Sequence, residues 1–128
     1  QRKYVEQFRI LKMLELLELD EDQELSFLTA YNSMRRELRK IDEERVRLIE
    51  KLAGGLRSET ISDSAIGDLT ERIFKADRMK RQVQSDFIEQ ASTTLAPRQF
   101  GRLVVFHERF ERELLDRVRA FREHKGGR

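Results

Sequence analysis

Apolar side chains recur at alternating steps of three and four residues in two stretches of the sequence, and this pattern constrains the fold most. Over residues 21–53 it is formed by Phe27, Tyr31, Met34, Leu38, Ile41, Arg45, Leu48 and Leu52. Over residues 63–94 it is formed by Ile66, Leu69, Ile73, Ala76, Lys80, Val83, Phe87 and Gln90. This spacing places each set on one face of an α-helix, as a seam that packs against another helix. We therefore expect two long helices joined by their seams.

The segment between these stretches predicts how the two helices meet. Gly54-Gly55 predicts the end of the first helix, because glycine readily adopts the positive φ angle that follows a helix C-terminus, and Ser62 or Asp63 predicts the N-cap of the next. Folding back here gives an antiparallel hairpin with a single register. That register pairs Leu52 with Ile66, Leu48 with Leu69, Ile41 with Ala76, Met34 with Val83, and Tyr31 with Phe87.

Two charged residues interrupt the seams. In the predicted register Arg45 faces Ile73 and Lys80 faces Leu38. We expect each long side chain to cover apolar surface with its stem and to extend its charged end to solvent.

Two shorter amphipathic segments flank the hairpin. Residues 2–19 carry Val5, Phe8, Leu11, Leu14 and Leu17, and residues 97–123 carry Phe100, Leu103, Phe106, Phe110, Leu114, Leu115, Val118 and Phe121. The chain is thus expected to be a single all-α domain, residues 1–128, with four helices at about 2–19, 21–53, 63–94 and 97–123. The surplus apolar surface of the outer helices favours a homodimer; a monomer with a folded-back fourth helix is the alternative.

Matching motifs start the second and fourth helices. Both read L-x-x-x-Q, in Leu19-Asp20-Glu21-Asp22-Gln23 and in Leu95-Ala96-Pro97-Arg98-Gln99. Asp20 is a good N-cap, and Gln23 falls where its side chain reaches back to the N-cap N–H, which predicts a capping box. In the second copy Pro97 suits the first helical position, whereas Ala96 is a poor cap.

Composition excludes several classes of protein. Charged residues make up 39% of the chain, there is no cysteine, and the net charge is +2. The sequence therefore has no disulfide, thiol catalysis or Cys-based zinc site, and no apolar run is long enough to span a membrane. The chain starts at Gln1 and not at Met, which is compatible with an upstream signal or anchor.

Cations gather near the middle of the predicted hairpin. Arg35, Arg36, Arg39 and Lys40 lie at the height of Lys75, Arg78, Lys80 and Arg81 on the other helix. One reading is a solvated face with local ion pairs. The other is a surface that binds anionic or partly unfolded partners.

The two corners, the long hairpin and Phe106-His107-Glu108-Arg109-Phe110 resemble the Spy/CpxP family of periplasmic stress proteins, which carries a repeated L-T-x-x-Q motif. Leu19, Gln23, Leu95 and Gln99 match that motif; Asp20 and Ala96 replace its threonine. The resemblance implies a curved, intertwined homodimer in the periplasm that captures unfolded or partner proteins without ATP. The client-binding candidates are then Arg35, Arg36, Arg39, Lys40, Arg78 and Arg81, and the motif residues are structural.

The same resemblance leaves open a metal-responsive sensor or resistance protein for zinc, nickel or cobalt. His107 and Glu111 are weak metal-ligand candidates, because residues four apart share a helix face. First-row metals, however, favour several converging imidazoles or thiolates, and a packed or interfacial histidine is the favoured reading. We expect no cofactor, no enzymatic activity and no nucleic-acid binding, since the chain has no phosphate-binding loop, nucleophile motif or recognisable nucleic-acid module.

Overall fold

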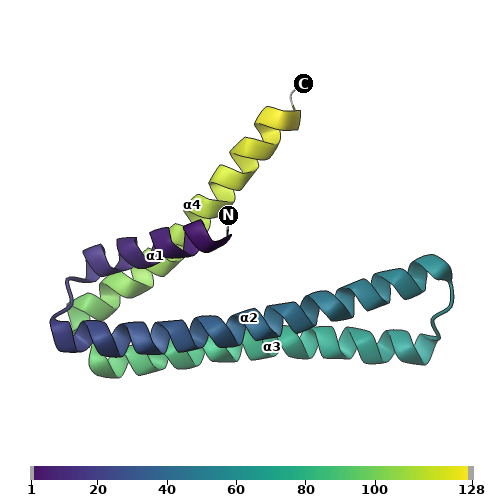
Figure 1. Ribbon diagram of the computed structural model, residues 1–128, viewed down its shortest axis with the longest axis horizontal. Coiled ribbons are helices and arrows are strands. Elements are labelled where there is room, and N and C mark those ends of the chain that lie inside the picture. Colours follow the sequence, from purple (N-terminus) through teal and green to yellow (C-terminus); the bar gives the residue numbers. More distant parts are fainter. Residues whose placement is uncertain (1, 127–128) are drawn as a thin grey trace. The chain divides into compact units, whose positions relative to one another are not determined.

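The computed structural model describes residues 2–126; the side chains of residues 2, 3, 111, 114, 115, 117, 118, 121 and 124–126 are outside this description. The chain forms four helices: α1 (Arg2–Leu17), α2 (Glu21–Ser58), α3 (Asp63–Thr94) and α4 (Pro97–Gly126) (Figure 1). The predicted all-α class is confirmed, and α3 has the predicted bounds. Among the described residues, no helix has the length and apolar character needed to cross a membrane.

These helices form two compact units. The hairpin unit, Ser26–Ala91, contains most of α2 and α3, which run side by side (Figure 1). The terminal unit combines Gln1–Leu25 with Ser92–Arg128 and therefore contains α1, α4 and both L-x-x-x-Q corners. The hairpin predicted from the two seams is confirmed.

The predicted end of the second helix was wrong. α2 continues through Gly54-Gly55, neither of which has a positive φ, and ends at Ser58. Glu59 adopts the left-handed conformation instead, with φ of 57°. The N–H of Glu59 donates to the carbonyl of Leu56 and the N–H of Thr60 to that of Gly55, both at 3.3 Å. This pair of bonds is the Schellman arrangement, which satisfies the last carbonyls of a helix.

Gly55 is required because a larger residue would not fit there, and not because its backbone needs a positive φ angle. A Cβ atom added there would lie 2.9 Å from the Cβ of Ile61, closer than carbon atoms pack. The missing side chain lets the loop fold back onto the last turn of α2. α3 then starts with the predicted Ser62 cap, whose hydroxyl accepts the N–H of Ala65 at 3.1 Å.

The hairpin unit has apolar contacts toward both ends. Near the loop, Leu48, Leu69 and Ile73 form a buried cluster, with Ile49, Leu52 and Ile61 packed against it. Toward the other end, the rings of Phe27, Tyr31 and Phe87 lie 5.7–6.1 Å apart, and all three are buried. The contacts of Tyr31 with Phe87 and of Leu48 with Leu69 confirm the predicted register at two separate heights.

The middle of the seam is ionic, which differs from the sequence-based expectation. Arg45 Nε lies 2.7 Å from Asp77 Oδ1, and Lys80 Nζ lies 3.0 Å from Asp42 Oδ1. Both cations therefore reach across the hairpin to a carboxylate instead of extending to solvent. Each helix contributes one acid and one base, three positions apart, so the two pairs are reciprocal. Such complementary charges favour one register over a shifted one.

In the terminal unit α1 packs antiparallel to α4. The rings of Phe8 and Phe110 lie 6.3 Å apart, and Glu18 Oε2 lies 3.8 Å from Arg102 Nη1. Leu17, Met13 and Leu103 are fully buried in this unit. α1 ends at Leu17 rather than at residue 19, because Glu18 has a positive φ of 51°. The further apolar side chains predicted for α4, at Leu114, Leu115, Val118 and Phe121, lie outside the described residues.

Candidate functional site

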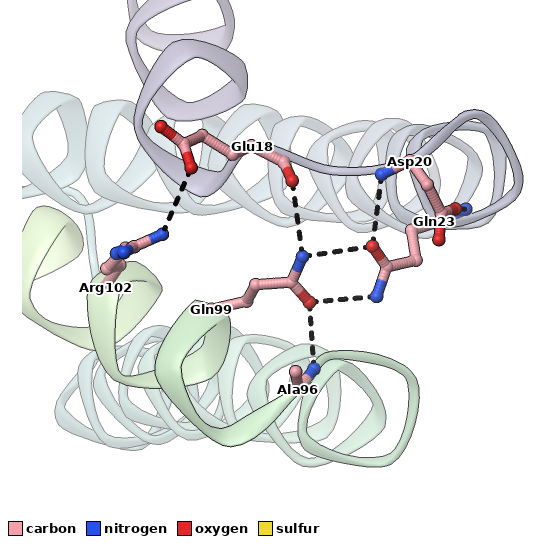
Figure 2. A network of polar contacts seen from close by, with 6 residues as sticks. All are labelled: Glu18, Asp20, Gln23, Ala96, Gln99 and Arg102. Carbon is pink, nitrogen blue, oxygen red and sulfur yellow. Dashed lines mark hydrogen bonds and ion pairs between the residues drawn. The ribbon is translucent and has the colours of Figure 1, made fainter.

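The side chains of the two motif glutamines form a reciprocal pair (Figure 2). Gln23 Nε2 donates to Gln99 Oε1 at 2.9 Å, and Gln99 Nε2 donates to Gln23 Oε1 at 3.0 Å. The pair links the start of α2 to the start of α4, two segments far apart in the sequence. Gln99 Nε2 also lies 3.4 Å from the carbonyl oxygen of Glu18, beside the ion pair of Glu18 with Arg102.

Each glutamine also caps its own helix. Gln23 Oε1 accepts the N–H of Asp20 at 3.2 Å, and Asp20 Oδ1 accepts the N–H of Gln23 at 2.8 Å, so the predicted capping box is confirmed. Gln99 Oε1 accepts the N–H of Ala96 at 2.9 Å, which completes half of a box because alanine has no acceptor to return. The repeated motif was the only signal in the sequence for the pairing of Gln23 with Gln99, and that pairing was not predicted.

The six client-binding candidates do not lie on one face. On a helix each residue is rotated by about 100° from the last, and relative to the seams Arg35, Arg39 and Arg81 fall on one flank of the hairpin. Phe74 and Val46 fall on the same flank and are 58% and 56% exposed. We call these five residues the arginine flank. This flank therefore carries cations near the heights of Arg35 and Arg39 and exposed apolar side chains further toward the loop, at Val46 and Phe74.

The other three candidates point elsewhere. Lys40 falls on the opposite flank, and Arg36 and Arg78 lie on the sides of their helices that face away from the seam. Arg78 is paired with Glu71 at 3.0 Å. The cations that the sequence places at one height of the hairpin thus point in several directions.

The opposite flank of the hairpin is hollowed. A groove of about 440 Å³ opens between α2 and α3, and Met34, Val83 and Phe87 contribute its apolar lining. Glu37 and Asp86 also line it, and both are exposed. The groove therefore differs from the arginine flank in charge, because its lining has carboxylates where the flank has guanidinium groups.

An exposed charge cluster lies nearer to the loop. Glu44 accepts hydrogen bonds from Arg47 Nη2 at 2.8 Å and Nε at 3.2 Å, and lies 3.5 Å from Arg72 on α3. These bonds to Arg47 lower the pKa of the Glu44 carboxyl, and Arg72 adds a smaller effect in the same direction. A carboxylate held ionised by two guanidinium groups is suited to joining helices and poorly suited to accepting a proton in catalysis.

His107 contacts a cation. Arg9 Nη2 lies 3.0 Å from His107 Nδ1, and since a guanidinium can only donate, this ring nitrogen is the acceptor. The same guanidinium lies 5.2 Å from the centre of the Phe110 ring. A neighbouring guanidinium opposes metal binding at that nitrogen. The Glu111 side chain lies outside the described residues, and within those residues no three His, Cys, Asp or Glu side chains are grouped to hold a metal ion.

No family model, no curated protein and no solved structure matches this chain. The arrangement of its own residues is therefore the basis for a functional proposal. Two surfaces of the hairpin unit offer such a basis: the arginine flank and the groove.

Proposed function

We propose that the chain is a periplasmic stress-response protein that captures unfolded or partner proteins without ATP, and that the arginine flank is its client-binding surface. The observation that carries this proposal is the exposure of Phe74 and Val46, each more than half accessible, on the flank that carries Arg35, Arg39 and Arg81. Large apolar side chains grouped on a surface are typical of sites of interaction.

The chemistry of this flank suits clients that are not folded. Unfolded chains expose apolar side chains together with acidic ones, and the flank offers a complementary group for each. The charges attract such a client over distance, and the apolar contacts then hold it. A flank that binds through side chains at the surface of two helices accepts many sequences and needs no nucleotide-driven change of shape.

The resemblance of the L-x-x-x-Q corners to the Spy/CpxP motif supports the periplasmic assignment. The paired glutamines give these corners a structural role, as that resemblance implies. A homodimer is part of the proposal. It is supported by apolar side chains that the terminal unit leaves accessible, such as Tyr4 at 77% and Leu11 at 66%, because a second copy would bury them.

Light scattering tests the proposal. A chemically denatured, acidic protein is diluted with and without the chain, in the absence of ATP and at low and high salt. We expect the chain to suppress aggregation, and salt to weaken the effect by screening the flank. The triple variant Arg35→Glu, Arg39→Glu and Arg81→Glu should lose at least half of the suppression.

The matched control reverses three cations that lie outside the flank, in Arg36→Glu, Lys51→Glu and Arg57→Glu. Each reversal changes the charge by two, so both variants go from a net charge of +2 to −4. We expect this control to keep most of the suppression. Equal losses in the two variants would assign the effect to net charge and reject the flank as the site, and no suppression by the natural chain would reject client capture.

A further inference from the structure

The groove on the other flank of the hairpin results from a row of small side chains on α2. On the α2 side it is lined by Ser26, Ala30 and Ser33, which are spaced by four and three residues and so lie above one another on one face. Their short side chains leave space beside the seam. Met34 and Phe87 belong to the seam itself and form the apolar floor. The hollow therefore follows from the sequence of α2.

The edges of the groove are acidic. Glu37 lines it on α2 and Asp86 on α3. Gln82 Nε2 donates to Asp86 Oδ1 at 2.8 Å, which orients this carboxylate from the same helix. None of the residues that line the groove is a lysine or an arginine, although the chain as a whole has a net charge of +2. The groove thus combines an apolar floor, hydroxyl groups and two carboxylates.

From this combination we infer that the groove is a docking site for a polypeptide segment that carries an apolar side chain beside a lysine or an arginine. The apolar side chain enters between Ser33 and Phe87, and the cation meets Glu37 or Asp86. A volume of about 440 Å³ accommodates a few side chains and not a folded domain. The small residues of α2 let the backbone of such a segment approach closely.

This site goes beyond the proposed client-binding surface. The arginine flank selects acidic, apolar segments, whereas the groove selects basic, apolar ones. The arginine flank and the groove therefore prefer opposite charges. The groove inference holds for any defined partner of the stated chemistry, whether or not the chain suppresses aggregation.

Fluorescence anisotropy with labelled peptides tests the inference directly. One peptide carries leucines with lysines, and its counterpart has glutamate at every lysine position. We expect the lysine peptide to bind at least about tenfold more tightly to the natural chain, and salt to weaken its binding. Tighter binding of the glutamate peptide, or equal binding of both, would overturn the inference.

Variants locate the site. Ser33→Phe fills the groove, and the pair Glu37→Lys and Asp86→Lys reverses its charge; each should weaken binding of the lysine peptide by about tenfold or more. Glu43→Lys with Glu50→Lys makes the same change of charge at exposed acids outside the groove, and should leave binding within about twofold. Circular dichroism confirms that each variant is folded; if Ser33→Phe is not, Ala30→Leu replaces it.

The outcomes separate the two proposals. If Ser33→Phe and the pair Glu37→Lys and Asp86→Lys leave binding of the lysine peptide unchanged, the groove is not its binding site, whatever the aggregation assay shows. Loss of aggregation suppression in the arginine variants, with peptide binding intact, supports both surfaces as independent sites. Peptide binding by a chain that suppresses no aggregation rejects client capture alone.

Discussion

Replacing Gln99 by alanine should measure what holds the two L-x-x-x-Q corners together. The substitution removes the acceptor for the N–H of Ala96 and both hydrogen bonds with Gln23. A net hydrogen bond contributes about 1 kcal/mol, and the loss of a helix cap costs about the same. Because Gln23 and Gln99 are half-buried, water replaces part of the loss. We therefore expect the free energy of unfolding to fall by about 2 kcal/mol.

A double-mutant cycle isolates the pairing from the capping. Gln23→Ala and Gln99→Ala each remove one cap and the shared pair, whereas the double variant removes both caps but the pair only once. The two single losses should therefore exceed the loss in the double variant by about 1–2 kcal/mol. Urea unfolding followed by circular dichroism gives the three values. Amide hydrogen exchange should become faster at Asp20 in Gln23→Ala and at Ala96 in Gln99→Ala, and each single variant should leave the other amide unchanged.

Gln82→Ala is the matched control. Gln82 is an exposed glutamine whose side chain bonds to Asp86 one turn along the same helix. Its loss should change stability by less than about 0.5 kcal/mol. A coupling between Gln23 and Gln99 below about 0.3 kcal/mol would show that the two corners are held by their apolar contacts, and would refute the role assigned to the pair.

Three other substitutions test separate features. Leu38→Lys places a third cation in the ionic middle of the seam and should lower the free energy of unfolding by about 2 kcal/mol; unchanged thermal stability would contradict the register. Glu59→Gly relieves the left-handed conformation after α2 and should raise the free energy of unfolding by about 0.5–1 kcal/mol, as urea unfolding would show; a loss would contradict the Schellman assignment. In a calorimetric zinc titration near neutral pH, the natural chain and His107→Ala should behave alike; affinity present only in the natural chain would revive the metal-sensor alternative.

The hairpin was predictable because its information is periodic and local. The seams of α2 and α3 identify the helices, and one register satisfies their pairs, as the contact of Tyr31 with Phe87 confirms. The end of α2 was not predictable by the same means. Gly54-Gly55 is an ordinary signal for the end of a helix, but α2 continues through both glycines to Ser58. Gly55 instead leaves the space that the side chain of Ile61 occupies.

The candidate surfaces were only partly predictable. The prediction used only the height of each cation along the hairpin and left out its direction around the helix, which the seam and the rotation of about 100° per residue also give. The direction of each residue around its helix divides the cations between flanks and puts Phe74 on the same flank as Arg39 and Arg81. The groove was missed because Ser26, Ala30 and Ser33 are unremarkable polar or small residues until a second helix lies beside them.

The sequence by itself determined the four helices, the antiparallel register of α2 with α3, and the capping of α2 by Asp20 and Gln23. Each follows from interactions between residues a few positions apart, or from a pattern repeated along a whole helix. Only the tertiary structure decided that Gln23 pairs with Gln99, that Arg45 and Lys80 reach carboxylates across the hairpin, and that a groove opens on one flank. These depend on side chains brought together from distant segments, and no local pattern specifies their distances.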